Sequence, residues 1–564
     1  MTELTRRGAL GLFAGATGLS GGTTGLEDPS TLQTYAGDAA FNHGVASGDP
    51  LSDRVIIWTR VTPVTGEGPI EVGYVVRDVE TGTVQAEGTV LTSAERDYTV
   101  KVDVEGLSDG TDYVYGFTVL TAGGEIVSST GRTRTAAASG DKPVRAAVVS
   151  CSNFPFGFFN VYEEISKQED LDLVIHLGDY LYEYGADGYG AEVGEALGRQ
   201  HAPAREIVSL ADYRERHAQY KADLSLQKAH AAAPWLCTWD DHESTNNSYR
   251  TGAENHNDGE GEWTERKQRA VQAYLEWMPV RDPAPGAPRS AIWRSFDFGD
   301  VATITCLESR LTGRSEEISW GAELADVEPA DIPETAQDVL LRVNDPSRTL
   351  LGADQEAWLS ERFEGSAQAG KPWHVLANQV IMAEVRMPNY AQTLTAEQVA
   401  GAVAAAGDNG SFVQLMVGFS QLGLPQNLDA WDGFPAARER LYAAAAAAGV
   451  DLITLTGDTH TAWANTLKDK SGGSRGVEFG CTSVTSPGLG RFLANVDDLG
   501  QQFADANDQV HWFDPHGNGF TLMTFYADRV TADFRKVSTV AEPDYTAATE
   551  AAFVYTKDQA LQQF

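Results

Sequence analysis

The sequence contains few cysteines, few basic residues and no long apolar run. Its 564 residues include 4 cysteines, Cys151, Cys237, Cys306 and Cys481, and none of them forms a CxxC pair. This spacing excludes a disulfide framework in a chain of this size, and we expect the last three in the core. Lys and Arg number 42 against 80 Asp and Glu, a formal net charge of −38. Because nucleic acids bind basic surfaces, we expect no stable nucleic-acid partner.

The N-terminal segment "MTELTRRGALGLFAGATGLSGG" carries the pair Arg6-Arg7 before a short Gly/Ala-rich run. The run is too short to span a bilayer as a helix, and it is typical of a twin-arginine export signal; the alternative is a frayed N-terminus. We assign residues 1–40 to this signal and a linker. The prediction is a periplasmic or secreted protein that is moved by the twin-arginine export machinery and has no transmembrane anchor.

Sequence patterning divides the rest of the chain into three parts. Residues 41–138 contain short alternating segments such as "IEVGYVVRDV" and "DYVYGFTVLT", separated by turns, which predict a small β-sandwich. Residues 143–540 alternate apolar strands with helical stretches, which predicts an α/β domain with a covered sheet. The amphipathic tail, 541–564, is predicted to be helical.

Polar residues follow the apolar strands of the α/β part at their C-terminal ends. These residues are Cys151, Asp179, Asp240, Asp241, Asn378, Asp458 and His460. In open α/β sheets, sites form beyond the carboxyl ends of the strands, so we expect these side chains to converge.

The segment "CTWDDHESTNN" places Asp240, Asp241, His242 and Glu243 directly after an apolar run. Two carboxylates about 4 Å apart repel by roughly 4 kcal/mol at an effective dielectric constant near 20, so the cluster is either spread over a hydrated loop or held by positive charge. Oxygen donors suit Ca²⁺, Mg²⁺, Mn²⁺ or Fe³⁺, whereas a thiolate, a phenolate such as that of Tyr182 and an imidazole suit a more polarising ion. The mixed set indicates two or more metals of different character.

The ordered motifs of this chain closely resemble the PhoD-like alkaline phosphatase family. They are "HGVASGDPLSDRVIIWTRVTP", "SCSNFPFGFFNVY", "GDYLYEYG", "LADYRERHAQYKADLSLQKAHAAAPWLCTWDDHESTNN", "AYLEWMPVR", "RSFDFGD", "WDGFPAARERL" and "LTGDTHTAW". They run from about Phe41 to Arg535. The family's core is similar to that of purple acid phosphatases, so the resemblance implies an α/β fold, a four-layer αββα metallophosphoesterase-like sandwich preceded by the small N-terminal β-sandwich.

The resemblance also implies a metal centre. Its first ion, Fe³⁺ in the family, would be bound by Cys151, Asp179, Tyr182 and His460. Asp179 would bridge to one or two Ca²⁺ ions, with Asp241, Asn378 and Asp458 as further ligands. Taken singly, a strand-end cysteine is more often a small buried hydrophobic residue, and a strand-end amide such as that of Asn378 often satisfies backbone groups.

Four further residues receive roles from the resemblance. His242 matches the imidazole beside the leaving group, or else it orients a metal ligand through a hydrogen bond without binding the metal itself. Asp240 and Asn247 either contact a further Ca²⁺ or hold the ligands in place. The sequence departs from its relatives at "CLESR", where they often have Asp-Thr-Arg; Arg310 remains a possible phosphate contact.

The resulting hypothesis is an exported alkaline phosphatase with phosphodiesterase activity, in which metal-bound hydroxide attacks phosphorus in line, with Asp179 and His242 as catalytic residues. Its substrates would be small phosphoesters or phospholipids. The alternatives are a phospholipase D-type enzyme and a nucleotide or nucleic-acid phosphodiesterase. A non-catalytic, calcium-binding surface protein is a more remote alternative, because every candidate position carries a competent ligand.

Overall fold

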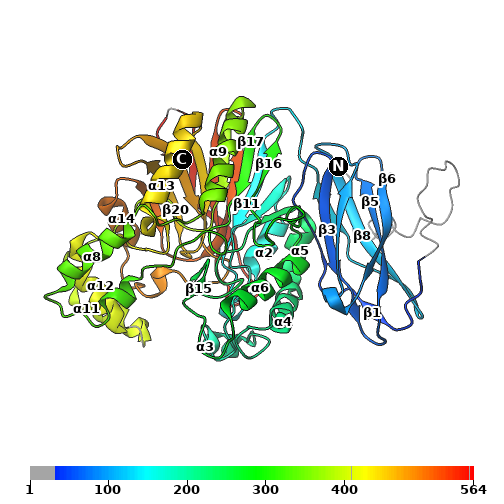
Figure 1. Ribbon diagram of the computed structural model, residues 1–564, viewed down its shortest axis with the longest axis horizontal. Coiled ribbons are helices and arrows are strands. Elements are labelled where there is room, and N and C mark those ends of the chain that lie inside the picture. The colour runs from blue at the N-terminus through cyan, green and yellow to red at the C-terminus, as the bar shows by residue number, and fades with distance from the viewer. Residues whose placement is uncertain (1–31, 408–409, 558) are drawn as a thin grey trace. The chain divides into compact units, whose positions relative to one another are not determined.

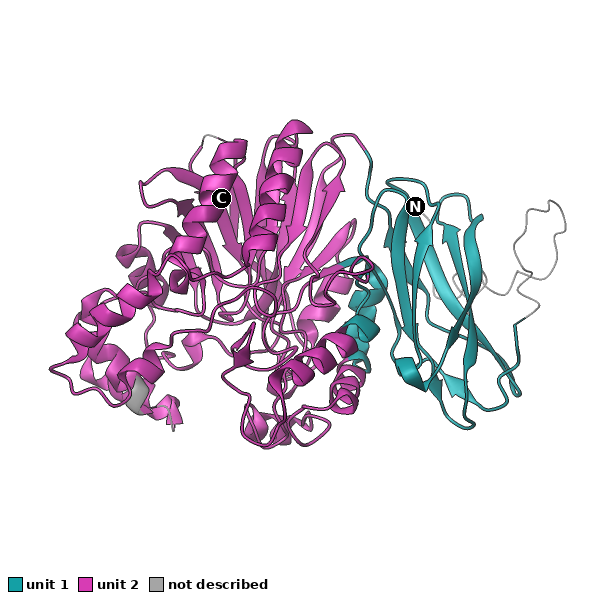
Figure 2. Cartoon of the chain, viewed as in Figure 1, with its two compact units in different colours: residues 1–138, 221–235, 275–281 teal, residues 139–220, 236–274, 282–564 magenta. Residues whose placement is uncertain are grey.

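The computed structural model describes residues 32–407, 410–557 and 559–564. Two compact units are found (Figure 2). The first contains the described residues up to Ala138 together with Lys221–Trp235 and Leu275–Arg281; the second contains Ser139–Tyr220, Leu236–Tyr274 and the described residues from Asp282 onward. Arg6 and Arg7 of the predicted export signal lie outside the described residues. Within the described ranges, no helix is long and apolar enough to cross a membrane.

The first unit is built mainly from antiparallel strands. One group pairs in the order β2 (Val45–Gly48), β3 (Arg54–Arg60) and β7 (Thr99–Glu105). The other has the order β10 (Gly131–Arg134), β8 (Asp112–Thr121), β5 (Ile70–Asp78) and β6 (Val84–Thr92), with β9 (Gly124–Val127) paired to β8. A short pair joins β1 (Ala39–Ala40) to β4 (Thr62–Pro63).

Alternate side chains of these strands share one core. Val55 and Ile57 of β3 are buried in the same cluster as Tyr115 and Phe117 of β8. The period of two follows from strand geometry, and it explains why the turn-separated alternation predicted these strands. The predicted N-terminal region of strands is confirmed.

The first sheet of the second unit mixes parallel and antiparallel pairs. β11 (Val144–Val149) lies parallel to β12 (Leu173–His176), which is followed in the sheet by β13 (Trp235–Cys237). On its other side, β11 pairs antiparallel with β23 (Asn518–Phe525), and β24 (Val530–Val537), β25 (Ala547–Tyr555) and β26 (Gln562–Gln563) continue outward. The hairpin of β23 and β24 confirms the one expected in "GFTLMTFYADRVTADFRKV".

The second sheet has seven strands, in the order β16 (Arg294–Phe298), β17 (Ala302–Cys306), β18 (Trp373–Ala377), β19 (Leu452–Thr456), β21 (Ser474–Gly480), β20 (Ala462–Lys468) and β22 (Val510–Asp514). Strands β17, β18, β19 and β21 are parallel. A small separate pair consists of β14 (Ser248–Tyr249) and β15 (Gly252–Ala253).

The two sheets of this unit pack face to face with helices outside them (Figure 1). Trp512 of β22 lies 4.7 Å from Phe534 of β24, between ring centroids. Helix α2 (Asn160–Ser166) packs on β23 and β24, whereas α13 (Pro435–Ala448) packs on β21 and on α9 (Ala353–Gln368). This arrangement of helix, sheet, sheet and helix confirms the predicted α/β architecture.

The described residues form further α-helices, of which α5 (Leu224–Ala232) belongs to the first unit. They are α3 (Ala191–Leu197), α4 (Leu210–Lys221), α5 (Leu224–Ala232), α6 (Trp263–Trp277), α7 (Trp320–Leu324), α8 (Ile332–Val343), α10 (Tyr390–Thr393), α11 (Ala396–Ala405), α12 (Gly410–Phe419) and α14 (Leu499–Ala506).

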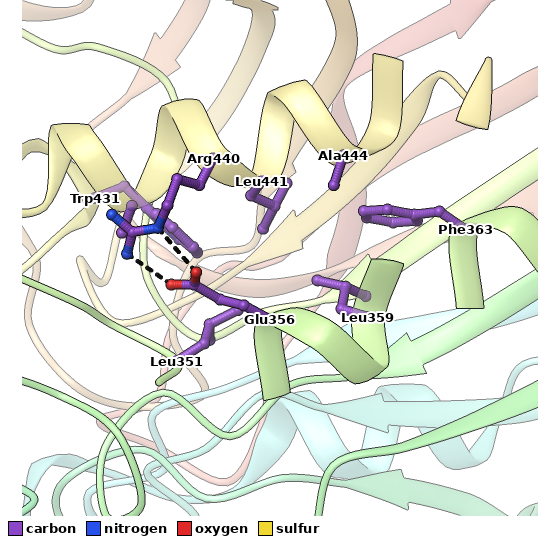
Figure 3. Close-up of a pocket in the computed structure, with 9 residues that line it drawn as sticks. Leu351, Glu356, Leu359, Phe363, Trp431, Arg440, Leu441 and Ala444 are labelled. Carbon is purple, nitrogen blue, oxygen red and sulfur yellow. Dashed lines mark hydrogen bonds and ion pairs between the residues drawn. The ribbon is translucent and has the colours of Figure 1, made fainter. Parts of the chain in front are cut away.

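An apolar cavity of about 140 Å³ lies between α9 and α13 (Figure 3). Leu359 of α9 and Ala444 of α13 line it together with Trp431. At its rim, the guanidinium of Arg440 donates two hydrogen bonds of 2.8 and 2.9 Å to Glu356. The cavity therefore combines an apolar lining with a mutually satisfied ion pair.

The prediction of a helical C-terminal tail is wrong. Residues Ala547–Tyr555 form strand β25 along β24, and Gln562–Gln563 form β26 along β25. Phe553 and Tyr555 are buried. Without β25, β24 would expose a row of unpaired backbone groups, and the run "FVYT" has the β-branched and aromatic residues that pack well in a strand. These tertiary interactions outweigh the helix propensity of the alanines.

Candidate metal centre

The candidate ligands follow strand ends at which the backbone turns sharply. Cys151, Asp179, Asp458 and His460 have φ angles of 62°, 54°, 64° and 58°. This left-handed conformation costs non-glycine residues on the order of 1–3 kcal/mol each, and such strain clusters at functional sites. These turns carry the chain out of β11, β12 and β19.

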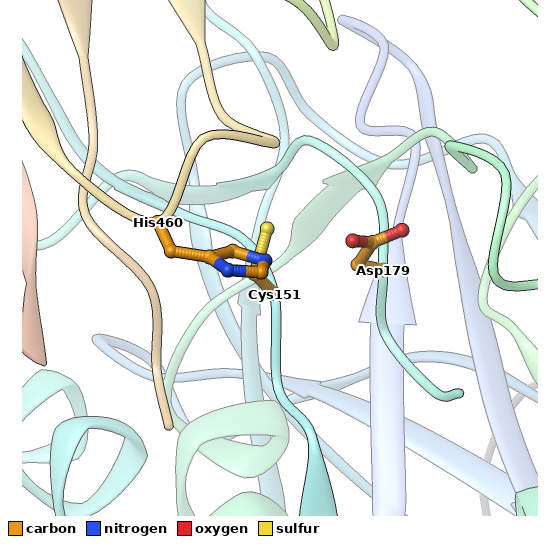
Figure 4. Close-up of side chains that lie close together, drawn as sticks. All are labelled: Cys151, Asp179 and His460. Carbon is orange, nitrogen blue, oxygen red and sulfur yellow. The ribbon is translucent and has the colours of Figure 1, made fainter. Parts of the chain in front are cut away.

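A first group of possible ligands comes from three separate segments. One ligand atom each from Cys151, Asp179 and His460 lies within 4.8 Å of the others (Figure 4). The hydroxyl of Tyr182 adds a fourth donor, 3.0 Å from Asp179 Oδ2, 3.1 Å from His460 Nε2 and 2.8 Å from Ser486 Oγ. A phenol has one proton, so it cannot donate to all three atoms at once.

A second group shares Asp179 with the first. Atoms of Asp179, Asp241 and His242 lie within 4.8 Å of one another. The Asp241 carboxylate is oriented by backbone N–H donors, from His242 at 3.0 Å and from Asn247 at 2.6 Å. The side-chain amide of Asn247 instead donates to Glu254 at 2.6 Å. Asn247 therefore contacts the site through its backbone.

Asn378 and Asp458 follow neighbouring parallel strands. The backbone N–H of Asn378 donates to Leu455 at the end of β19. Its side-chain amide donates to Val380 at 2.5 Å, and its Oδ1 accepts from the indole of Trp431 at 3.4 Å. Asp458 Oδ1 lies 3.7 Å from Nη2 of Arg310. Both residues therefore follow the carboxyl ends of parallel strands, where the sequence predicted them.

Arg310 is fully buried and surrounded by carboxylates. It donates from Nε to Asp240, and from both Nη atoms to Asp429 at 2.7 Å. Its Nη2 also lies 4.0 Å from Asp241 Oδ1. Arg314 donates to the same carboxylate of Asp429. Sequence reasoning missed Asp429, for which the only signal was its position two residues before the motif "WDGF".

Glu183 was also missed. Its Oε2 lies 2.6 Å from Nδ1 of His242, and its Oε1 accepts from the backbone N–H of Asn246 at 2.8 Å and the side chain of Asn255 at 2.9 Å. The residue stands inside the motif "GDYLYEYG", between Tyr182 and Tyr184. A carboxylate beside a candidate ligand was the available signal.

Burial and neighbouring charges shift the titration of the site. Burial raises the pKa of Asp179 and of Asp458 well above the usual range, and neighbouring carboxylates add to the rise. Burial likewise raises the pKa of Cys151 and Tyr182, with Asp179 as a further cause. Without positive charge, the site therefore disfavours its anionic forms.

The two histidines are shifted in opposite directions. Burial lowers the pKa of His460 to about 4, so its imidazole is neutral at pH 7 and can act as a ligand. Burial opposes protonation of His242 as well, but the charges of Asp241 and Glu183 outweigh it and raise this pKa well above its usual value. His242 is thus suited to hold a proton.

The donor set fits a cation. Asp179 Oδ1 and Asp240 Oδ2 are buried oxygens without a hydrogen-bond donor among the described residues. Buried polar atoms almost always have a partner, and unpaired ones call for an explanation such as an ion. Thiol, phenol, imidazole and carboxylate groups meeting at one place suit a polarising ion with a harder neighbour.

The fold and site together define an α/β protein whose clustered side chains are suited to hold a metal ion. The chain belongs to the PhoD-like phosphatase family: the model of the PhoD-like phosphatase domain matches residues 146–534, and that of its N-terminal domain matches residues 27–137. The resemblance inferred from the motifs is confirmed.

Two relatives cover nearly the whole chain. Alkaline phosphatase D of Bacillus subtilis (strain 168) is 33% identical over 535 residues, which cover 92% of this chain and 81% of the relative. A solved structure described as PhoD has a TM-score of 0.75 and 32% identity, and the match covers 93% of this chain and 92% of that one.

Proposed function

We propose that this protein is an exported, metal-dependent phosphoester hydrolase, an alkaline phosphatase that also cleaves phosphodiesters. The observation that carries the proposal is the convergence of Cys151, Asp179 and His460 within 4.8 Å, with Asp241 and His242 around the same Asp179. Family membership supports phosphoester hydrolysis. Export rests on the Arg6-Arg7 segment of the sequence.

Two kinds of cation suit the proposed ligands. Cys151, Tyr182 and His460 would hold Fe³⁺ together with Asp179, because the soft and anionic donors suit a strongly polarising ion. Asp241, Asn378 and Asp458 would hold Ca²⁺ with Asp179 as the bridge, because they offer oxygen donors. Bound cations supply Lewis acidity, which activates water and screens the charge of a phosphate group.

The side chains around the proposed ligands hold those ligands in position and supply a proton to the departing oxygen. His242 is held by Glu183 and would donate a proton to the departing oxygen of the ester. Asp240 keeps Arg310 beside the carboxylates, and Asn247 fixes Asp241 through its backbone N–H. Arg310 would offer its Nη2 edge, which faces Asp241 and Asp458, to a phosphate oxygen.

One experiment tests the proposal directly. Elemental analysis of the natively exported protein is combined with turnover of a nitrophenyl phosphate monoester and its bis-ester, with and without chelator. We expect iron and calcium in the protein, hydrolysis of both esters and loss of activity in chelator. Asp179→Ala should lose nearly all activity and both metals. Chelator-insensitive turnover, or more than a few per cent of activity in Asp179→Ala, would contradict the proposal.

A further inference from the structure

A row of aromatic rings leads away from His242. The ring centroid of Tyr184 lies 5.6 Å from that of His242 and 5.8 Å from that of Tyr189. Tyr189 in turn lies 4.8 Å from Phe156. We call Tyr184, Tyr189 and Phe156 the aromatic strip. Tyr182 covers His242 at 4.1 Å and is part of the candidate metal centre instead.

The strip reaches solvent at Tyr189. This side chain is 38% exposed. The exposed guanidinium of Arg491 lies 5.4 Å from the ring centroid of Phe156. The strip therefore has an accessible ring at Tyr189, and a surface cation lies beside the strip at Phe156.

Two glycines allow the rings to approach one another. A Cβ on Gly190, whose φ is +93°, would lie 2.9 Å from a ring carbon of Phe156. A Cβ on Gly188 would lie 3.0 Å from Cβ of Tyr184. Gly190 has no room for a larger side chain and Gly188 has little, so the backbone on both sides of Tyr189 lies close to the two rings that Tyr189 contacts.

The position of the strip determines which part of a substrate it meets. His242 is proposed to protonate the departing oxygen, so the leaving group lies beside this histidine and hence beside Tyr184. Aromatic rings bind other planar rings through offset or edge-to-face contacts, and a guanidinium stacks on such rings as well.

We propose that the aromatic strip, with Arg491 at its outer end, binds the leaving group of the substrate, and that the preferred substrates are phosphoesters whose leaving group contains a planar aromatic ring, either an aryl-substituted alcohol or a nucleoside. This inference rests on the proposed function.

The test compares esters that differ in aromaticity but have similar size and leaving-group chemistry. Benzyl phosphate and cyclohexylmethyl phosphate both release a primary alcohol, and a nucleoside 5′-monophosphate is the third substrate. We expect kcat/KM of the native, metal-containing protein to favour benzyl over cyclohexylmethyl phosphate by about tenfold, which corresponds to one favourable ring–ring contact. If kcat/KM for the nucleotide also exceeds that for cyclohexylmethyl phosphate by about tenfold, the leaving group is a nucleoside. If kcat/KM exceeds it for benzyl phosphate alone, the leaving group is an aryl-substituted alcohol.

Variants test whether the aromatic strip causes the preference for an aromatic leaving group. Tyr189→Leu and Tyr184→Leu should each reduce the benzyl to cyclohexylmethyl ratio toward one, whereas Tyr189→Phe should keep it because the ring remains. Tyr545→Leu is the matched control, since Tyr545 contacts Lys167 of α2 and lies outside the strip. An unchanged ratio in Tyr189→Leu, or a wild-type ratio near one, would overturn the inference while leaving phosphoester hydrolysis intact.

A binding measurement tests the aromatic strip independently of the proposed phosphoester hydrolysis. Phenylphosphonate and cyclohexylphosphonate cannot be hydrolysed at the carbon–phosphorus bond, and calorimetry gives their affinities for the same protein. We expect phenylphosphonate to bind about tenfold more tightly, and Tyr189→Leu to remove the difference. If no ester is hydrolysed yet this difference persists, the proposed function fails, and with it the leaving-group role of the strip, while the binding of aromatic rings by the strip stands; equal affinities contradict the strip.

Discussion

The Nδ1 atom of His242 lies 2.6 Å from Oε2 of Glu183, a carboxylate with no exposed surface. The second oxygen of Glu183 accepts hydrogen bonds from Thr245, Asn246 and Asn255. The carboxylate is therefore held in place from one side and holds the imidazole on the other, so that Nε2 of His242 is the nitrogen left to meet a substrate.

Glu183→Gln should lower kcat by roughly 10- to 100-fold, less than the roughly 10²–10⁴-fold that general acid catalysis as a whole contributes, because the imidazole itself remains. The amide oxygen can replace Oε1, which leaves the amide NH₂ facing Nδ1 and disfavours the imidazolium. Because Glu183 raises the pKa of His242, its neutralisation lowers that pKa. The reaction needs the protonated form, so the alkaline limb of the kcat profile moves to lower pH. Steady-state kinetics across pH measures both effects.

The control for this variant is Glu356→Gln, which neutralises a carboxylate paired with Arg440 at the rim of the cavity between α9 and α13. It should leave the pH profile unchanged. A Glu183→Gln profile that coincides with that of the wild type would show that the hydrogen bond does not control the proton on His242.

Cation removal should make stability fall as pH rises from about 6.5 to 8. Burial raises the folded-state pKa of Asp179 and Asp458. A raised carboxyl pKa favours folding where the group is protonated, and this contribution is lost as pH rises from about 3.9, the unfolded value, through the folded value. His242, whose pKa is also raised, contributes in the same direction. His460, whose pKa is lowered to about 4, contributes in the opposite direction, but only below about pH 6.5, the unfolded value.

Calorimetry with chelator, compared with added Ca²⁺ and iron, measures this effect. We expect the Tm of the chelated protein to drop by roughly 2 °C or more over this range, and the metal-containing protein to show a smaller drop because cations compensate the carboxylates. Parallel curves for the two samples would contradict a cation site at these residues.

The strand positions could be predicted because the buried strands of this chain are short apolar runs that are followed by polar residues. The apolar runs before Cys151, Asp179 and Asp458 end where the structure ends β11, β12 and β19. The tail was not predictable in the same way: "TAATEAAFVYT" contains both alanines and β-formers, and the unpaired edge of β24 decides between helix and strand.

The candidate site likewise contains residues that could be predicted from the sequence and residues that could not. Side chains that follow apolar strands were identifiable from position, whereas Glu183 and Asp429 act through partners that are distant in sequence, His242 and Arg310. One sequence does not reveal which of its 80 acidic residues face a buried cation. Arg310 was expected near phosphate, yet its contacts with Asp240 and Asp429 emerge only from the fold.

Filling the cavity between α9 and α13 should stabilise the protein. Ala444 lines this cavity of about 140 Å³, and Ala444→Leu adds apolar atoms to it (Figure 3). Cavity filling commonly contributes about 0.5–2 kcal/mol. Urea denaturation measures the gain, with Ala369→Leu at the end of α9 as the control outside the cavity. A loss of stability in Ala444→Leu alone would mean that the surrounding side chains cannot accommodate the added volume.

Asp429→Asn should be strongly destabilising, because the buried Asp429 carboxylate compensates two buried guanidinium groups, Arg310 and Arg314. Removal of one partner from a buried ion pair typically costs about 3–5 kcal/mol. The matched control is Asp508→Asn: Asp508 pairs with Lys468, but its side chain is 82% exposed. An exposed pair contributes about 0–1 kcal/mol. Urea denaturation compares the two variants, and a cost below about 1 kcal/mol for Asp429→Asn would show that other carboxylates around Arg310 replace Asp429.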